Sequence, residues 1–84
     1  MNMTMTKEKE SIVKQLEELI AEYQGRYDEE LKKSSELTDK MLATEDNEQF
    51  QHFMSELDDC HKDAMYFLGK IHALDESLDI IKIG

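Results

Sequence analysis

Residues 50–81 read FQHFMSELDDCHKDAMYFLGKIHALDESLDII. An uninterrupted apolar series with alternating steps of three and four runs through them: Phe50, Phe53, Leu57, Cys60, Ala64, Phe67, Ile71, Leu74, Leu78 and Ile81. This spacing places the series on one side of an α-helix, as in helices that pair in coiled coils, and it lacks the every-second-residue alternation of a strand. The stretch predicts a helix over 47–79, and leaves the 80–84 tail open between helical, extended and mobile.

A second stripe with the same spacing comes earlier in the chain. Its members are Val13, Leu16, Ile20, Tyr23, Tyr27, Glu30, Ser34, Leu37 and Met41. The polar pair Glu30 and Ser34 interrupts it, so we expect the weakest packing there, with Leu31 covering part of the gap from one position over. Thr6 is a plausible N-cap, because its hydroxyl can accept from the free N–H groups of a first turn. The stripe predicts a helix over 7–43 that follows a flexible arm over 1–6.

Polar residues separate the two stripes and predict a turn over 44–47. Asp46 or Asn47 can cap the second helix, and with Asp46 as the cap Gln49 is placed to reach back in a capping box. Two long helices joined by so short a connection lie antiparallel. The predicted fold is therefore all-α: one domain over 1–84, an antiparallel two-helix hairpin of coiled-coil type.

Charge and composition exclude several classes of function. The 84 residues contain 20 acidic and 10 basic side chains, a net charge of −10, which argues against direct binding to nucleic acid or to an anionic membrane. No apolar run approaches the roughly 18 residues of a membrane span. A single cysteine and an N-terminus without the apolar core of a signal peptide lead us to expect a cytoplasmic protein.

No residue pattern indicates catalysis, a cofactor or a metal. The cluster 58–61, Asp-Asp-Cys-His, has ligand types, but Cys60 lies on the apolar stripe while Asp59 points elsewhere, which is poor geometry for the four converging ligands of zinc. Cys60 is expected to be a small core residue, with a pKa that nearby aspartates raise. A hairpin also offers no concave pocket, so we expect no enzyme.

Both stripes are broader than one facing helix can cover, and a core this small seldom stabilises a chain without disulfides or metals. We therefore expect the hairpin to complete its core with a partner protein or as a homodimer when alone. For the aromatic residues and methionines among the candidate partner-facing residues, core packing is the favoured explanation over partner contact. The candidates are Tyr23, Tyr27, Leu31, Phe50, Phe53, Met54, Met65 and Leu68.

The layout resembles the YscE-like family of small co-chaperones for type III secretion needle subunits. The resemblance spans about residues 12–75 and is carried by a hairpin whose polar turn is entered through an Asp and a Gln-aromatic-Gln, here Asp46, Gln49, Phe50 and Gln51. It implies a hairpin that pairs with a larger tetratricopeptide-like chaperone, the two together keeping a polymerising needle subunit monomeric in the cytoplasm.

Two alternatives remain open. One is an acidic homodimeric four-helix bundle, either a regulator or a phage-encoded inhibitor that imitates nucleic acid. This alternative follows from the charge distribution, because residues 44–84 carry ten acidic and three basic side chains. The other alternative is a structural coiled-coil spacer.

Overall fold

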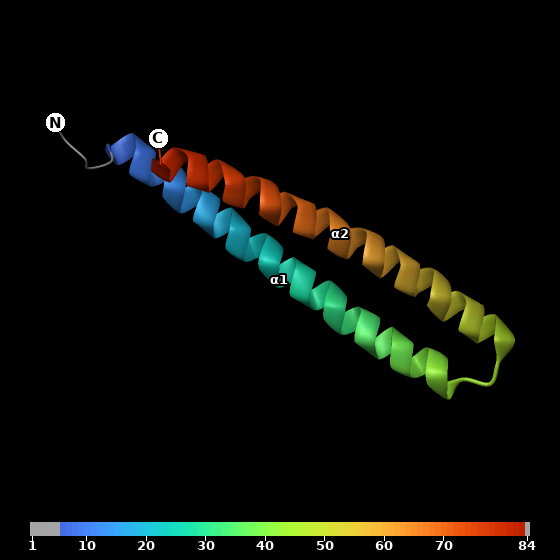
Figure 1. The fold of residues 1–84 in the computed structure, drawn as a ribbon. Helices are drawn as coiled ribbons and strands as arrows, with labels where there is room; N and C mark the ends of the chain where they lie inside the picture. The colour runs from blue at the N-terminus through green and yellow to red at the C-terminus, as the bar shows by residue number, and fades with distance from the viewer. Residues whose placement is uncertain (1–5, 84) are drawn as a thin grey trace.

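The chain forms two long antiparallel α-helices joined by a short turn (Figure 1). A computed structural model describes residues 6–83. Helix α1 spans Lys7–Ala43 and helix α2 spans Asn47–Ile83, each 37 residues long. The predicted all-α hairpin is confirmed. The predicted arm is described only at Thr6, whose hydroxyl accepts from the backbone N–H of Lys9 at 3.1 Å and so caps α1 as expected.

The two predicted stripes meet between the helices in what we call the seam. All the members of both series, from Val13 to Met41 and from Phe50 to Ile81, are buried or half-buried. A continuous apolar cluster fills the half of the seam nearer the termini, where Val13, Ile20, Ile71 and Leu78 are buried. This half of the hairpin is therefore the better-packed half, because the stripe of α1 contains no polar residue there.

The turn consists of Thr44, Glu45 and Asp46, one residue shorter than predicted. Asp46 caps α2, since its carboxylate accepts from the N–H of Glu48 at 2.9 Å. The predicted capping box is wrong in one respect: the N–H of Asp46 donates to the Thr44 hydroxyl oxygen at 3.2 Å, and this hydroxyl donates to Gln49 at 3.4 Å. The Thr44 hydroxyl thus bridges the backbone N–H of Asp46 and the side chain of Gln49, which a capping box would join directly.

Helix α2 continues to Ile83, four residues beyond its predicted end at Asp79. The physical reason is that Ile81 continues the three-four spacing and packs against the apolar cluster. Lys82 adds an ion pair across the helices, with its Nζ 4.0 Å from the Glu17 carboxylate. The described part of the tail is thus helical, and Gly84 lies outside the described residues. Neither described helix is long and apolar enough to cross a membrane.

Candidate functional site

The seam is interrupted midway along the hairpin by polar groups from α1. The Glu30 side chain is only 12% exposed, and its carboxylate accepts from Lys33 Nζ at 3.4 Å. One turn further on, the Ser34 hydroxyl oxygen is buried without a hydrogen-bond partner. Leu31 does not cover this gap as predicted, because the 100° step from Glu30 carries it away from the seam and leaves it 45% exposed.

Cys60 of α2 faces this break and is 8% exposed, which confirms its prediction as a small core residue. Burial raises the pKa of the Cys60 thiol, and the nearby Glu30 carboxylate raises it further. The carboxylate with the larger effect thus comes from the facing helix, ahead of Asp63 on α2 itself. The thiol stays protonated at neutral pH and is a weak nucleophile there.

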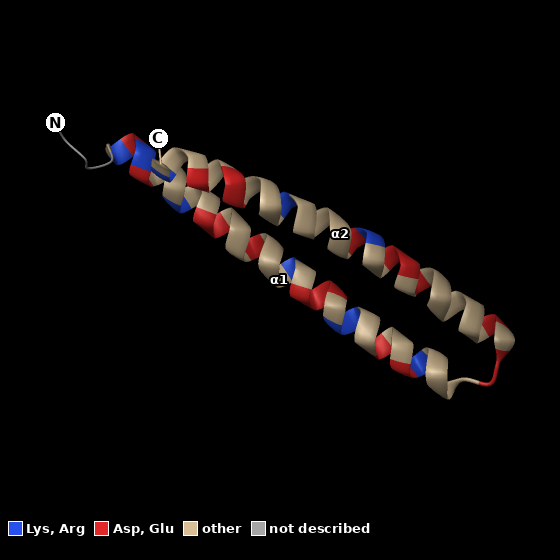
Figure 2. Ribbon diagram, viewed as in Figure 1, with Lys and Arg blue, Asp and Glu red and all other residues tan. Residues whose placement is uncertain are grey.

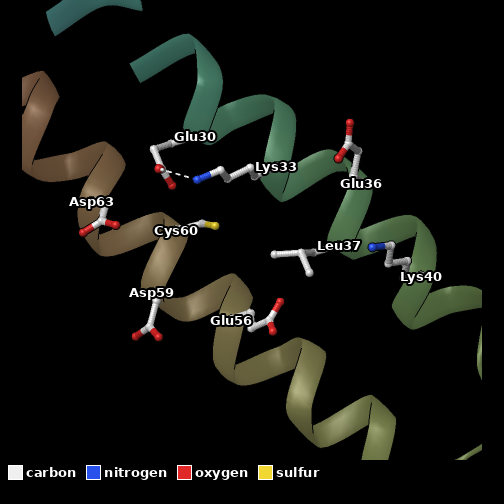
Figure 3. Close-up of a pocket in the computed structure, with 9 residues that line it drawn as sticks. All are labelled: Glu30, Lys33, Glu36, Leu37, Lys40, Glu56, Asp59, Cys60 and Asp63. Atoms are coloured by element: carbon white, nitrogen blue, oxygen red, sulfur yellow. Dashed lines mark hydrogen bonds and ion pairs between the residues drawn. The ribbon is translucent and has the colours of Figure 1, made fainter. Parts of the chain in front are cut away.

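A groove of about 400 Å³ opens beside Cys60 (Figure 3). Its walls carry Lys33 and Lys40 from α1 and Glu56 and Asp63 from α2. The sequence led us to expect no concavity, and that expectation was wrong: a groove lies where Cys60 faces the break in the stripe of α1. The described residues 6–83 include no group of three or more His, Cys, Asp or Glu side chains placed to hold a metal ion.

The hairpin has two distinct long edges, which the contacts between helices identify. Glu17 directly follows the seam residue Leu16 in the sequence, and Lys82 directly follows the seam residue Ile81. Because Glu17 and Lys82 form an ion pair across the helices, the positions that directly follow seam residues lie on one edge of the hairpin. Leu31 and Leu68 lie two heptads inward from Glu17 and Lys82 respectively and therefore stand in the same relationship on the same edge. We call the surface formed by Leu31, Met54, Met65 and Leu68 the Leu31 edge.

Positions directly before a seam residue lie on the opposite edge. Lys33, Lys40, Glu56 and Asp63 are of this kind, and all four line the groove. Nearer the termini the same edge carries exposed apolar side chains among charged ones. We call the surface formed by Ile12, Leu19, Tyr66 and Ile80 the Ile12 edge; Tyr66 belongs to it because Lys70 Nζ, from a position before Ile71, lies 5.5 Å from its ring centroid.

The structure divides the eight predicted partner-facing residues into two groups. Tyr23, Tyr27, Phe50 and Phe53 are half-buried members of the seam, and the rings of Tyr23 and Phe67 approach to 6.0 Å between centroids. Leu31, Met54 and Met65 are exposed on the Leu31 edge, and Leu68 is half-buried beside them. Core packing therefore accounts for the four aromatic residues, and the four aliphatic and thioether residues remain available to a partner.

Sequence reasoning omitted other exposed apolar residues from the candidate set. Ile12 and Leu19 lie at the edge of the well-packed half of the seam, 47% and 40% exposed. Tyr66 and Ile80 belong with them at 57% and 70%. Their position one step outside the stripe would have marked them, because a residue 100° from the seam is only partly covered by a single facing helix.

Charge differs between the helices as well as between the edges. Figure 2 shows acidic residues along both helices and few basic residues on α2. A helical hairpin is a scaffold used for many unrelated roles, so the fold alone assigns no function. No protein-family model matches the chain, and no curated protein or solved structure shows significant similarity to it.

Proposed function

We propose that this hairpin is a protein-binding adaptor that completes its core by association with another chain. The observation that carries the proposal is the row of large apolar side chains exposed on both edges, with Leu31 and Met65 on one and Ile12 and Tyr66 on the other. Large apolar side chains that stay exposed along the edges of a small protein mark a site of interaction.

The incompleteness of the core supports this proposal. Among the described residues no side chain falls below 2% exposure, so even the best-buried seam positions retain some contact with solvent. The accessible surface is 6577 Å², whereas a compact monomer of 9.9 kDa exposes about 5,200 Å². The excess is larger than the roughly 800 Å² that one partner contributes to a standard protein–protein interface.

The YscE-like resemblance gives this adaptor a specific role, which we propose for it. The hairpin would act as a cytoplasmic co-chaperone that binds a tetratricopeptide-like chaperone and helps keep a type III secretion needle subunit monomeric. Alone, it would cover part of its apolar surface by forming a homodimer. A hairpin with exposed edges suits such partner exchange, because its surface has to be hidden by one occupant after another.

A second candidate function follows from the acidic surface of α2. Residues 44–84 carry ten acidic and three basic side chains, so the helix can present an array of negative charge to a basic surface. In this reading the protein is a homodimeric four-helix-bundle regulator or a phage-encoded inhibitor that blocks a nucleic-acid-binding protein.

Purification of the tagged protein from its native host, followed by mass spectrometry of the bound proteins, tests these functions. Recovery of a tetratricopeptide-containing protein together with a small helical subunit would support the co-chaperone role, and recovery of a nucleic-acid-binding protein the inhibitor role. Light scattering of the isolated protein is the control for association itself. A fully helical, cooperatively unfolding monomer at micromolar concentration would contradict the adaptor function.

A further inference from the structure

We infer that the Leu31 edge binds a cationic amphipathic helix of a partner protein. This assignment rests on the proposed adaptor function and adds both the surface and the chemistry of the partner. Exposed apolar side chains on this edge include Leu31, Met54 and Met65, which are 45%, 47% and 66% exposed, and Leu42, which directly follows the seam residue Met41 and is 80% exposed. Leu68 is half-buried at the level of Leu31 and one turn from Met65, so both helices contribute to an apolar strip formed by Leu31, Met65 and Leu68, with Met54 further toward the turn.

A helix is the occupant that fits this strip. The edge runs along two nearly parallel cylinders, each 37 residues long, and the shallow channel between two such helices accepts the apolar face of a third. The partner's side chains at steps of three and four would lie over Leu31, Leu68 and Met65 in turn. The helices of the bundle would then share a core that two helices cannot enclose.

The charges along the Leu31 edge indicate which charge a partner helix should carry. In its central region the charged side chains at the edge positions are all acidic: Asp28 on α1, and Asp58 and Asp75 on α2. Lys62, from the outer face, pairs with Asp58 at 3.3 Å, and both side chains are more than half exposed. Basic groups flanking the apolar face of a partner helix would meet these carboxylates.

The Ile12 edge differs in this respect. It carries Arg26, Lys33, Lys40 and Lys70 at the positions directly before seam residues, together with the carboxylates of the groove. Basic and acidic groups are thus interleaved there. A second copy of this chain is also a poor occupant for the Leu31 edge, because two edges with the same negative charge would face each other and the whole chain carries −10.

The test uses a synthetic amphipathic helix, with leucine at steps of three and four and with lysine and arginine on its flanks, titrated into the isotopically labelled full chain. We expect saturable binding, with NMR shift changes centred on Leu31, Met65 and Leu68. A matched peptide with glutamate in place of the basic residues should bind at least about tenfold more weakly, because like charges across an interface disfavour binding.

Two double variants with similar exposure provide the controls. Leu31→Ser with Met65→Ser removes apolar contact from the proposed site, and we expect binding to weaken by about tenfold or more. Ile12→Ser with Tyr66→Ser removes a similar exposed surface from the other edge and should leave binding within about twofold. Circular dichroism checks that both variants remain helical.

The outcomes separate this inference from the adaptor function. Shifts centred on Ile12 and Leu19, equal binding of both peptides, or an absence of saturable binding would each overturn the assignment of the Leu31 edge. So would loss of a homodimer on Leu31→Ser with Met65→Ser, since the edge would then belong to a second copy. A protein partner recovered from the host that still binds this double variant would overturn the assignment and leave the adaptor function intact.

Discussion

Glu30 of α1 and Cys60 of α2 meet across the seam at the point where the apolar stripe of α1 fails. The carboxylate raises the pKa of the thiol, and both side chains are largely removed from water. Removing the Glu30 carboxylate from water costs free energy. Its ion pair with Lys33 offsets only part of this cost, because the Lys33 side chain is exposed. The middle of the hairpin is therefore the place where substitution can strengthen the fold.

Replacing Glu30 with leucine should stabilise the hairpin. The substitution removes the partly desolvated charge and extends the apolar stripe past Cys60, so we expect the free energy of unfolding to rise by about 1 to 3 kcal/mol. Urea denaturation followed by circular dichroism measures the change. Glu29→Leu, at an exposed neighbouring position, is the matched control. An equal effect of the two substitutions would show that Glu30 is not desolvated in the seam.

Ser34→Ala should also stabilise the protein, by about 1 kcal/mol. The buried Ser34 hydroxyl oxygen has no hydrogen-bond partner, and deletion of an unsatisfied polar atom recovers its desolvation cost. The same denaturation experiment measures it. Ser35→Ala, on the exposed side of the helix, should change the stability by less than about 0.5 kcal/mol. A loss of stability in Ser34→Ala would mean that the hydroxyl makes a favourable interaction.

The raised pKa of Cys60 predicts a loss of stability at alkaline pH. The folded state favours the protonated thiol, so this contribution is fully present below the pKa of the unfolded thiol and disappears as the pH rises through the folded-state pKa. We expect the free energy of unfolding to fall more steeply between about pH 8 and pH 10 in the wild-type protein than in Cys60→Ala. Both proteins contain the same tyrosines and lysines, so the difference between their slopes isolates the thiol. Parallel slopes would argue against a shifted pKa.

The elements of the fold followed from periodicity, because the side chains that end up in the seam are those at steps of three and four. Phe67, for instance, is placed in the seam by its spacing alone, and the structure puts its ring beside that of Tyr23. The end of α2 was harder to predict. Ile80, Ile81 and Ile83 fit several local patterns, and only the packing of Ile81 against the facing helix distinguishes among them.

The interruption in the seam was predicted, but its consequences were not. A one-dimensional pattern locates Glu30 and Ser34 on the stripe without showing which residue of α2 faces them. The pairing of Glu30 with Cys60, and the groove beside it, depend on the register between the helices. The stripe itself does distinguish Tyr23, which is one of its members and lies in the seam, from Met65, which directly follows a member and lies on an edge.

Gly25→Ala and Gly69→Ala should each raise the free energy of unfolding by about 0.5 to 1 kcal/mol. Both glycines lie inside helices, where glycine is less favourable than alanine, and a Cβ added at either position meets no atom within 4 Å. Thermal unfolding of the single variants measures the effect. The reverse substitution at another exposed helical position, Ala21→Gly, should destabilise by a similar amount. Destabilisation by either glycine-to-alanine substitution would contradict this prediction. It would indicate that the added methyl group meets an atom of another chain.

Asp46→Ala should lower the free energy of unfolding by about 1 kcal/mol. The Asp46 carboxylate accepts from the N–H of Glu48 at the start of α2, and its negative charge also suits the positive end of the helix dipole. Asp46→Asn keeps the acceptor without the charge, so comparison of the two variants separates the hydrogen bond from the dipole interaction.

The cap acts at the end of α2 that lies far from the well-packed half of the seam. In Asp46→Ala, hydrogen exchange should therefore show faster opening of the first turn of α2, while the amides of Ile71 and Leu78 keep their protection. Equal loss of protection throughout the hairpin would instead show that the two helices unfold only as a single unit.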